Sequence, residues 1–321
     1  MFRLPIFATA FRLFFFACSA HALFVITLWI LKLRGLSVAE TSVSPTYWHT
    51  YEMVFGFSRA AIFGFLFTAG QHWSGKFLLG GSSLVMLFSL WLAGRFAFFL
   101  PLPWSYAAFA LDIICTGFAL YRLRPLMNPE QKHNHKVFYL TVMFFLSQVM
   151  ALAALHAYSR GELFLHSLRL ALLIVVLFVA VISGRILPFF ASVVMQGEKP
   201  RILPALERLV WPAALLALLS YALLPAGKFF TYLAAVAFAA SAALHGLRWY
   251  FWRPFSSFRT PILAILYAGY LWLIAGFAMQ AFAVLGLMPA SPARHMFGVG
   301  AGGVFIFGMM TRVALGHTEV D

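Results

Sequence analysis

The stretch around residue 50 holds the densest group of side chains able to do chemistry. His49, Glu52, Gly56 and Arg59 fall on one stripe of an α-helix, because successive residues turn by about 100°. A carboxylate that accepts the free N–H of an imidazole orients it for metal binding, so Glu52 is expected to orient His49. The alternative is that His49 and Glu52 anchor a helix end, with Arg59 paired to Asp112 or to a backbone carbonyl.

Histidines also mark both ends of two predicted membrane helices. His49 and His72 are about 35 Å apart along a helix that rises about 1.5 Å per residue, and His295 and His317 are about 33 Å apart. Both separations match the thickness of a bilayer. If the two helices pack together, His49 meets His295 at one face. His72 then meets His317 at the other. Paired imidazoles of neighbouring helices can hold haem or copper, although histidine is also tolerated singly at a membrane interface.

Other ionisable residues within apolar runs are less specific. Asp112 lies midway along such a run, where an ionisable group normally faces protein or water. His21 and His245 are interpreted as hydrogen-bonded histidines of the helix core. His156 and His166 flank a predicted turn and are weaker candidates as metal ligands.

The composition assigns these residues to a membrane protein. The 321 residues are 63% hydrophobic and only 10% charged, whereas soluble domains are about a quarter charged. A soluble chain of this length could not bury so much apolar surface. The net charge of +14 does not indicate nucleic-acid binding, because the basic residues stand singly or in pairs between apolar segments. Cys18 and Cys115 both lie in apolar runs, so covalent haem attachment through CxxCH and thiolate metal clusters are excluded.

Apolar runs of about 20 residues are long enough to cross a bilayer as helices. The sequence predicts ten such spans, at 11–31, 52–71, 77–98, 104–121, 137–158, 163–187, 206–225, 229–250, 262–286 and 294–315. The first run is too long for a cleaved signal segment. Most basic loop residues fall on the side that carries both termini, which predicts cytoplasmic termini. The expected fold is an all-α, polytopic transmembrane helical bundle, with residues 1–321 in a single domain.

Several motifs, in order along the chain, resemble the NnrS family. They are the segments Trp48–Phe57, Gly64–Ala69, Trp73–Gly75, Gly184–Phe190, Gly269–Trp272 and Met309–Thr318. The matches extend from residue 11 to residue 318, and the last segment is the most specific. The resemblance implies a haem- and copper-containing protein of the bacterial inner membrane, linked to nitric oxide and nitrosative stress during denitrification.

The chain departs from the family pattern at two histidines and in its number of spans. Tyr51 stands where the family pattern WHxHEM has its second histidine. In the ninth span, family members commonly have a histidine just before the Gly-Tyr pair, and this chain has Tyr267 nearby. The predicted spans are also fewer than is usual in the family. These departures weaken the expectation of copper more than that of haem.

The resemblance strengthens the candidates His49, Glu52, His295, Arg312 and His317. We expect a non-covalently bound haem b with His49 and His295 as its ligands. Arg59 or Arg312 is expected to offset the charge of the haem propionates. The candidate metal ligands as a whole, with copper as the second metal, are His49, His295, His72 and His317.

The favoured function is that of a haem-bearing membrane protein in the nitric oxide response, which binds or detoxifies nitric oxide or protects metal centres from it. Its expected partners are the lipid bilayer and nitric oxide, with no nucleic acid. One alternative is a proton-coupled transporter that uses Glu52, Arg59 and Asp112 as a relay. Another is a factor that handles haem or copper for a different complex. The sequence assigns no catalytic residue and no oligomeric state.

Overall fold

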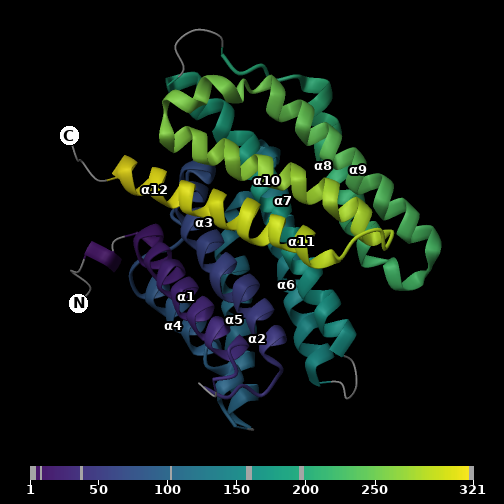
Figure 1. Cartoon of the computed structure of the whole chain (residues 1–321). Coiled ribbons are helices and arrows are strands. Elements are labelled where there is room, and N and C mark those ends of the chain that lie inside the picture. Colours follow the sequence, from purple (N-terminus) through teal and green to yellow (C-terminus); the bar gives the residue numbers. More distant parts are fainter. Residues whose placement is uncertain are drawn as a thin grey trace. The chain divides into compact units, whose positions relative to one another are not determined.

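The computed structural model describes residues 5–7, 9–36, 39–101, 103–156, 161–194 and 199–317. These residues form helices joined by turns and short loops, without a β-strand (Figure 1). Ten helical segments among them are long and apolar enough to cross a membrane. The all-α transmembrane fold predicted from the sequence is therefore confirmed for the described part of the chain. The chain divides into two compact units, residues 1–171 and 172–321, and the division falls within one long helix, α7.

The first unit contains the first five spans. Its elements are η1 (Pro5–Phe7), α1 (Ala10–Leu33), α2 (Pro45–Tyr51), η2 (Glu52–Ser58), α3 (Arg59–Ser74), α4 (Gly81–Gly94), η3 (Ala97–Phe99), α5 (Trp104–Leu123), η4 (Arg124–Met127), η5 (Pro129–Asn134) and α6 (His135–His156). Helix α1 packs along η2 and α3, and α5 packs against both α4 and α6. Figure 1 shows α1, α3, α4 and α5 running alongside one another.

The second span is longer than predicted and is not a uniform α-helix. It covers Pro45–Ser74, whereas the prediction was 52–71. The hydroxyl of Ser44 caps its start by accepting the backbone N–H of Tyr47, and Pro45 suits the first helical position. The element η2 in its middle is a π-helix. The α-helical spacing used to predict one stripe therefore does not hold between Glu52 and Arg59.

The second unit contains the last four spans and the C-terminal part of α7, a helix that as a whole covers Gly161–Val194. Its other elements are α8 (Pro204–Ala222), η6 (Leu224–Ala226), α9 (Lys228–Phe251), η7 (Pro254–Arg259), α10 (Pro261–Val284), α11 (Ala290–His295), η8 (Met296–Val304) and α12 (Phe305–His317). Helix α9 packs against α8 and α10, and α10 packs along η8 and α12. The predicted sixth span, 163–187, ends too early, because α7 continues through Pro188 to Val194. Proline is tolerated there because neighbouring groups can satisfy the freed carbonyl in a membrane helix.

Candidate functional site

Asp112 on α5 is the centre of a buried ionic cluster in the first unit. Its side chain is fully buried. One carboxylate oxygen, Oδ1, contacts the guanidinium groups of Arg59 and Arg95, the latter at 2.5 Å. The other oxygen, Oδ2, accepts hydrogen bonds from the hydroxyl of Tyr51 at 2.7 Å and from the side-chain amide of Gln148 at 2.9 Å. With donors on both oxygens, Asp112 is held as an anion.

Two arginines on different helices hold this cluster together. Arg59 of α3 is fully buried and donates to the Asp112 carboxylate, to the Asp112 backbone carbonyl at 3.1 Å and to the hydroxyl of Thr116 at 2.9 Å. The sequence alternative that paired Arg59 with Asp112 is thus confirmed. Arg95, directly after α4, donates from Nη1 to Glu52 and from Nη2 to Asp112, both at 2.5 Å. Arg95 therefore joins the two carboxylates.

The close approach of α4 and α5 depends on a glycine. A β-carbon at Gly94 would collide with the carboxylate of Asp112. With glycine there, α4 ends against the cluster, and the following Arg95 is only 5% exposed. In the sequence Arg95 stands at the end of a predicted span, where an arginine is normally read as a loop residue. Sequence reasoning therefore missed it as a site residue.

Glu52, the first residue of η2, is the second carboxylate of the cluster. Its side chain is 1% exposed. Its Oε2 accepts the hydrogen bond from Arg95, and Nε2 of His21 on α1 lies 3.0 Å from the same oxygen. Its Oε1 is buried and has no hydrogen-bond partner. We expected Glu52 to orient His49, and the imidazole that its carboxylate contacts is that of His21.

Gly56 makes room for the contact between α1 and η2. A β-carbon at Gly56 would collide with Nε2 of His21 and would lie 2.8 Å from Oε2 of Glu52. The main-chain carbonyl of Gly56 accepts a hydrogen bond from the indole N–H of Trp91 at 3.1 Å. Glycine at this position therefore lets the imidazole of His21 reach the carboxylate of Glu52.

The four formal charges of the cluster sum to zero. They are those of Glu52, Arg59, Arg95 and Asp112, all 5% exposed or less. Buried charges lose their hydration, and they are tolerated only where opposite charges and hydrogen bonds replace it. Removing one of these four would leave the others unbalanced in a protein interior surrounded by lipid.

The second unit has a smaller polar cluster around His245 of α9. The imidazole is fully buried, and its Nδ1 lies 2.5 Å from the hydroxyl oxygen of Tyr270 on α10. Its Nε2 is buried without a hydrogen-bond partner. The ring stacks on Phe277 with a centroid distance of 5.2 Å. Arg248, one turn further along α9, donates to the Tyr270 hydroxyl at 3.2 Å and pairs with Glu207 of α8.

Helix α7 also contacts this smaller cluster, in addition to α8, α9 and α10. The Nη1 group of Arg248 donates to the backbone carbonyl of Ala180 at 3.1 Å. A β-carbon at Gly184 would collide with the same guanidinium group. Gly184 belongs to one of the sequence motifs that resembled a known family, and its role here is to admit the arginine.

The two histidines predicted as haem ligands lie in different surroundings. His49 is half-buried on α2, and its ring stacks on Trp29 of α1 with a centroid distance of 4.5 Å. His295, the last residue of α11, is exposed, and its Nδ1 lies 2.8 Å from the backbone carbonyl of Ser291. His49 belongs to the first unit and His295 to the second. Their pairing stays a prediction.

The remaining predicted residues are more peripheral. His72 is exposed near the end of α3. The side chain of His317 lies outside the described residues. Arg312 on α12 places its guanidinium carbon 4.7 Å from the ring centroid of Phe190. The pairing of His72 with His317 also stays a prediction.

Each of the two spans with predicted haem ligands contains a π-helical segment. The first, η2, begins at Glu52, shortly after His49, and the second, η8, begins at Met296, directly after His295. Such segments are frequent at functional sites. Sequence periodicity does not reveal them.

Three further residues of the ionic cluster were not selected from the sequence as site residues. They are His21, Arg95 and Gln148. The available signal was weak, because each is a single polar residue in or at the end of an apolar run. Their convergence depends on how α1, α4 and α6 pack around α5 and η2.

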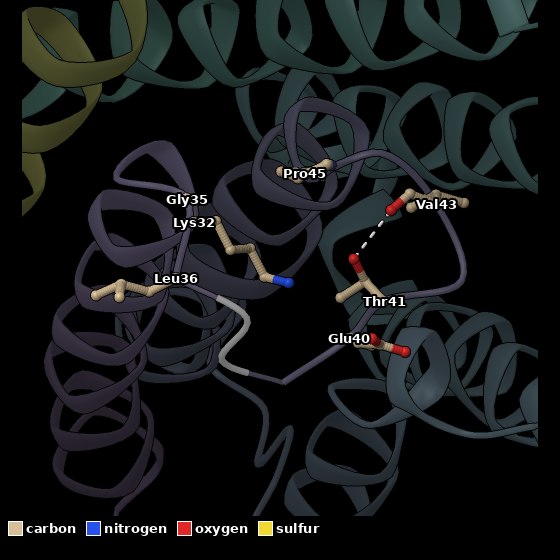
Figure 2. Close-up of a pocket in the computed structure, with 7 residues that line it drawn as sticks. All are labelled: Lys32, Gly35, Leu36, Glu40, Thr41, Val43 and Pro45. Carbon is tan, nitrogen blue, oxygen red and sulfur yellow. Dashed lines mark hydrogen bonds between the residues drawn. The ribbon is translucent and has the colours of Figure 1, made fainter.

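A surface pocket of about 350 Å³ lies where α1 ends and α2 begins (Figure 2). It is lined by Lys32, Gly35, Leu36, Glu40, Thr41, Val43 and Pro45. The ammonium group of Lys32 donates to the Ala39 carbonyl at 2.6 Å, and the Thr41 hydroxyl donates to the Val43 carbonyl at 2.9 Å. These polar groups already have partners within the loop, and we assign no function to the pocket.

Comparison with protein families decides what this transmembrane chain is related to. The family model described as NnrS protein matches residues 5–320. The chain belongs to the NnrS family. Membership links it to the nitric oxide response in general. Comparisons with curated proteins and with solved structures found no match.

Tyr51 and Tyr267, which the resemblance to the family singled out in the sequence, both use their hydroxyl groups. Tyr51 donates to Oδ2 of Asp112 at 2.7 Å, within the ionic cluster. Tyr267 donates to the backbone carbonyl of Trp252 at 2.7 Å. In this NnrS member both positions therefore contribute hydrogen bonds to the helix packing.

Proposed function

We propose that this NnrS member is a haem b protein of the bacterial inner membrane that binds nitric oxide or protects metal centres from it. The family match supports the link to nitric oxide, and the ten apolar segments support a multi-pass membrane protein. One observation carries the proposal of the cofactor. The imidazole of His295 in the second unit has Nδ1 close to a backbone carbonyl oxygen, which leaves Nε2 for a metal.

His295 would be able to hold the iron of a haem through one ring nitrogen. A backbone carbonyl can only accept a hydrogen bond, so the contact with Ser291 fixes the proton of His295 on Nδ1. The lone pair of Nε2 is then available for iron. A fixed tautomer of this kind is typical of metal-binding histidines. We propose His49 as a further candidate haem ligand on the ground of the sequence alone, and its own variant tests it.

His245 is an additional candidate that the structure supplies. Its Nε2 is fully buried and lacks a hydrogen-bond partner. An unsatisfied polar atom is costly inside a membrane protein, where water cannot replace the missing partner. The Tyr270 hydroxyl can accept the Nδ1 proton, which would leave the Nε2 lone pair for a metal. Binding iron would remove the cost.

The available ligands favour haem over copper. Among the described residues, no group of three or more His, Cys, Asp or Glu side chains is placed to hold a metal ion. Copper sites take most of their ligands from such groups, whereas haem brings its own ring of nitrogen ligands and needs only axial ones. Copper remains the secondary proposal, with the four histidines named from the sequence as its candidate ligands.

The arginines divide between two tasks in this proposal. Arg59 and Glu52 are engaged in the buried ionic cluster, so we propose that they stabilise the helices rather than contact haem. Arg312 contacts the ring of Phe190, and we propose that it offsets propionate charge. When bound, haem would supply an iron site for a diatomic gas.

Optical and metal analysis of the purified full chain tests this function. We expect a haem Soret band that shifts when nitric oxide is added. His49→Ala, His245→Ala and His295→Ala should be compared with His133→Ala as a loop control. Haem loss in a ligand variant, with haem retained in the control, supports the ligand assignment.

Two outcomes would contradict the proposal at different levels. A colourless, metal-free wild-type protein would reject haem binding. Haem retained in full by all three ligand variants would reject the ligand assignment and leave the function standing. Rapid transfer of haem to an apoprotein acceptor would favour the alternative of a haem-handling factor.

The buried ionic cluster favours a second candidate, a proton-coupled transporter. Glu52 has one carboxylate oxygen without a hydrogen-bond partner, so it can accept a proton. Substrate-dependent proton uptake by reconstituted vesicles, abolished in Glu52→Gln, would support this function.

A further inference from the structure

The two buried carboxylates of the first unit differ in how completely they are hydrogen-bonded. Asp112 has two arginines on Oδ1, and Tyr51 and Gln148 on Oδ2. Glu52 shares Arg95 with it and has no donor on Oε1. A carboxylate with spare lone pairs in a dry interior gains from an additional positive charge or proton, whereas a saturated one does not.

His21 is placed to supply that proton. Its Nε2 lies 3.0 Å from Oε2 of Glu52, and neither group is more than 7% exposed. Despite this short distance, Nε2 has no hydrogen-bond partner in the structure. We propose that His21 and Glu52 form a proton-binding site inside the membrane, in which the Nε2–H of His21 faces the Glu52 carboxylate and the added proton binds Nδ1 of the same ring, so that the carboxylate stabilises the resulting imidazolium. The proposal does not depend on haem binding.

Adding one proton to the pair changes the net charge of the ionic cluster from zero to +1. The arginines and carboxylates of the cluster balance, so a neutral His21 gives a neutral site. A protonated His21 adds a single positive charge directly beside Glu52. Among the charged and titratable groups of the neighbouring elements, Arg95, directly after α4, contacts Glu52, and it is linked through Asp112 of α5 to Arg59 of α3 and Tyr51 of α2.

The ligand class follows from the number of donors at the pair. His21 and Glu52 supply one imidazole and one carboxylate. No third His, Cys, Asp or Glu joins them to form a metal-binding group among the described residues. A proton needs only these two atoms, whereas a transition metal needs further ligands.

Gly56 controls the contact between the two residues. Any β-carbon there would occupy the position of His21 Nε2. Gly56→Ala should therefore separate the imidazole from the carboxylate while leaving both side chains in the protein. Gly117→Ala on α5 is the matched control, because a β-carbon there would meet only the ring of Phe145, at an ordinary 3.8 Å.

Infrared difference spectroscopy of the purified full chain during acidification tests the site. In the wild type, the first proton goes to His21, and Glu52 takes up a proton only at lower pH, where its carboxylic acid C=O band appears. In His21→Gln the band should appear at higher pH, because the stabilising imidazolium is gone. The same displacement is expected in Gly56→Ala and not in Gly117→Ala. In Glu52→Gln the band should be lost.

The proposal is overturned if Glu52 protonates at the same pH in the wild type, His21→Gln and Gly56→Ala. It is also overturned if the wild type binds no proton on the His21 ring, as judged from imidazole bands, over the pH range in which it stays folded. If Glu52→Gln does not fold, the His21→Gln comparison alone decides. If the wild-type protein is colourless and gives the infrared results expected above, the haem proposal is rejected and the present proposal stands.

Discussion

The two units each bury an arginine and a histidine, but the neighbours of the histidine differ. In the first unit, His21 contacts a carboxylate, and that carboxylate shares an arginine with a second one. In the second unit, His245 contacts a neutral hydroxyl, and the carboxylate of that cluster, Glu207, pairs with Arg248 and keeps 27% of its side chain exposed.

This difference separates proton binding from metal binding. A carboxylate can orient a metal-binding imidazole, but Glu52 is buried and has one oxygen without a donor, so it also stabilises the charged imidazole, which must lose a proton before it can bind a metal. A histidine beside a hydroxyl can stay neutral and keep one nitrogen free. The first unit is therefore suited to hold a proton, and the second is suited to offer an imidazole to iron.

The largest effect is expected when the charge at the centre of the first cluster is removed. Asp112→Asn keeps the volume and leaves two buried arginines facing one carboxylate. Breaking a buried ion pair in this way costs about 3–5 kcal/mol. We expect poor yield or a large drop in thermal unfolding temperature in detergent. Glu40→Gln, at an exposed carboxylate, is the control. Equal stability of the two variants would show that the cluster does not hold the unit together.

A smaller loss is expected where a glycine lets helices approach. In Gly94→Ala the new methyl group would overlap the carboxylate of Asp112, and such overpacking costs about 1–3 kcal/mol. Gly117→Ala on the neighbouring helix should be neutral or slightly stabilising, since its β-carbon meets only Phe145. Thermal unfolding of both variants measures the difference. A Gly94→Ala protein as stable as Gly117→Ala would contradict the packing described for α4 and α5.

The smallest single effect is expected at Tyr267, in a comparison with Tyr51. Tyr51→Phe removes a hydrogen bond to a charged carboxylate and should cost about 1.5–3 kcal/mol. Tyr267→Phe removes a bond to a neutral carbonyl and should cost about 0.5–1.5 kcal/mol. Unfolding measurements on both variants rank them. The reverse order would mean that the charged cluster adds no strength to this bond.

Much of the fold could be predicted, because span positions depend on the length and composition of apolar runs. All ten predicted spans have a helical counterpart in the structure. The ends were less accurate, since the hydropathy pattern missed the cap at Ser44 and the continuation of α7 through Pro188. The stripe drawn through Glu52 and Arg59 assumed an α-helix where a π-helix lies.

The candidate site was predicted only in part, for a different reason. Glu52, Arg59 and Asp112 stood out because charge is costly in an apolar run. Their partners did not, because His21, Arg95 and Gln148 come from other helices and carry no local pattern.

The sequence alone determined that this protein is a helical membrane protein and which of its residues are too polar to face lipid, because both depend on the transfer free energy of single segments and side chains. Only the tertiary structure decided which charge meets which, because those contacts join helices that are far apart in the chain. Glycines let α1, η2, α4 and α5 pack closely together. This packing gave Asp112 a hydrogen-bond donor on each carboxylate oxygen and left Glu52 with one oxygen that has none.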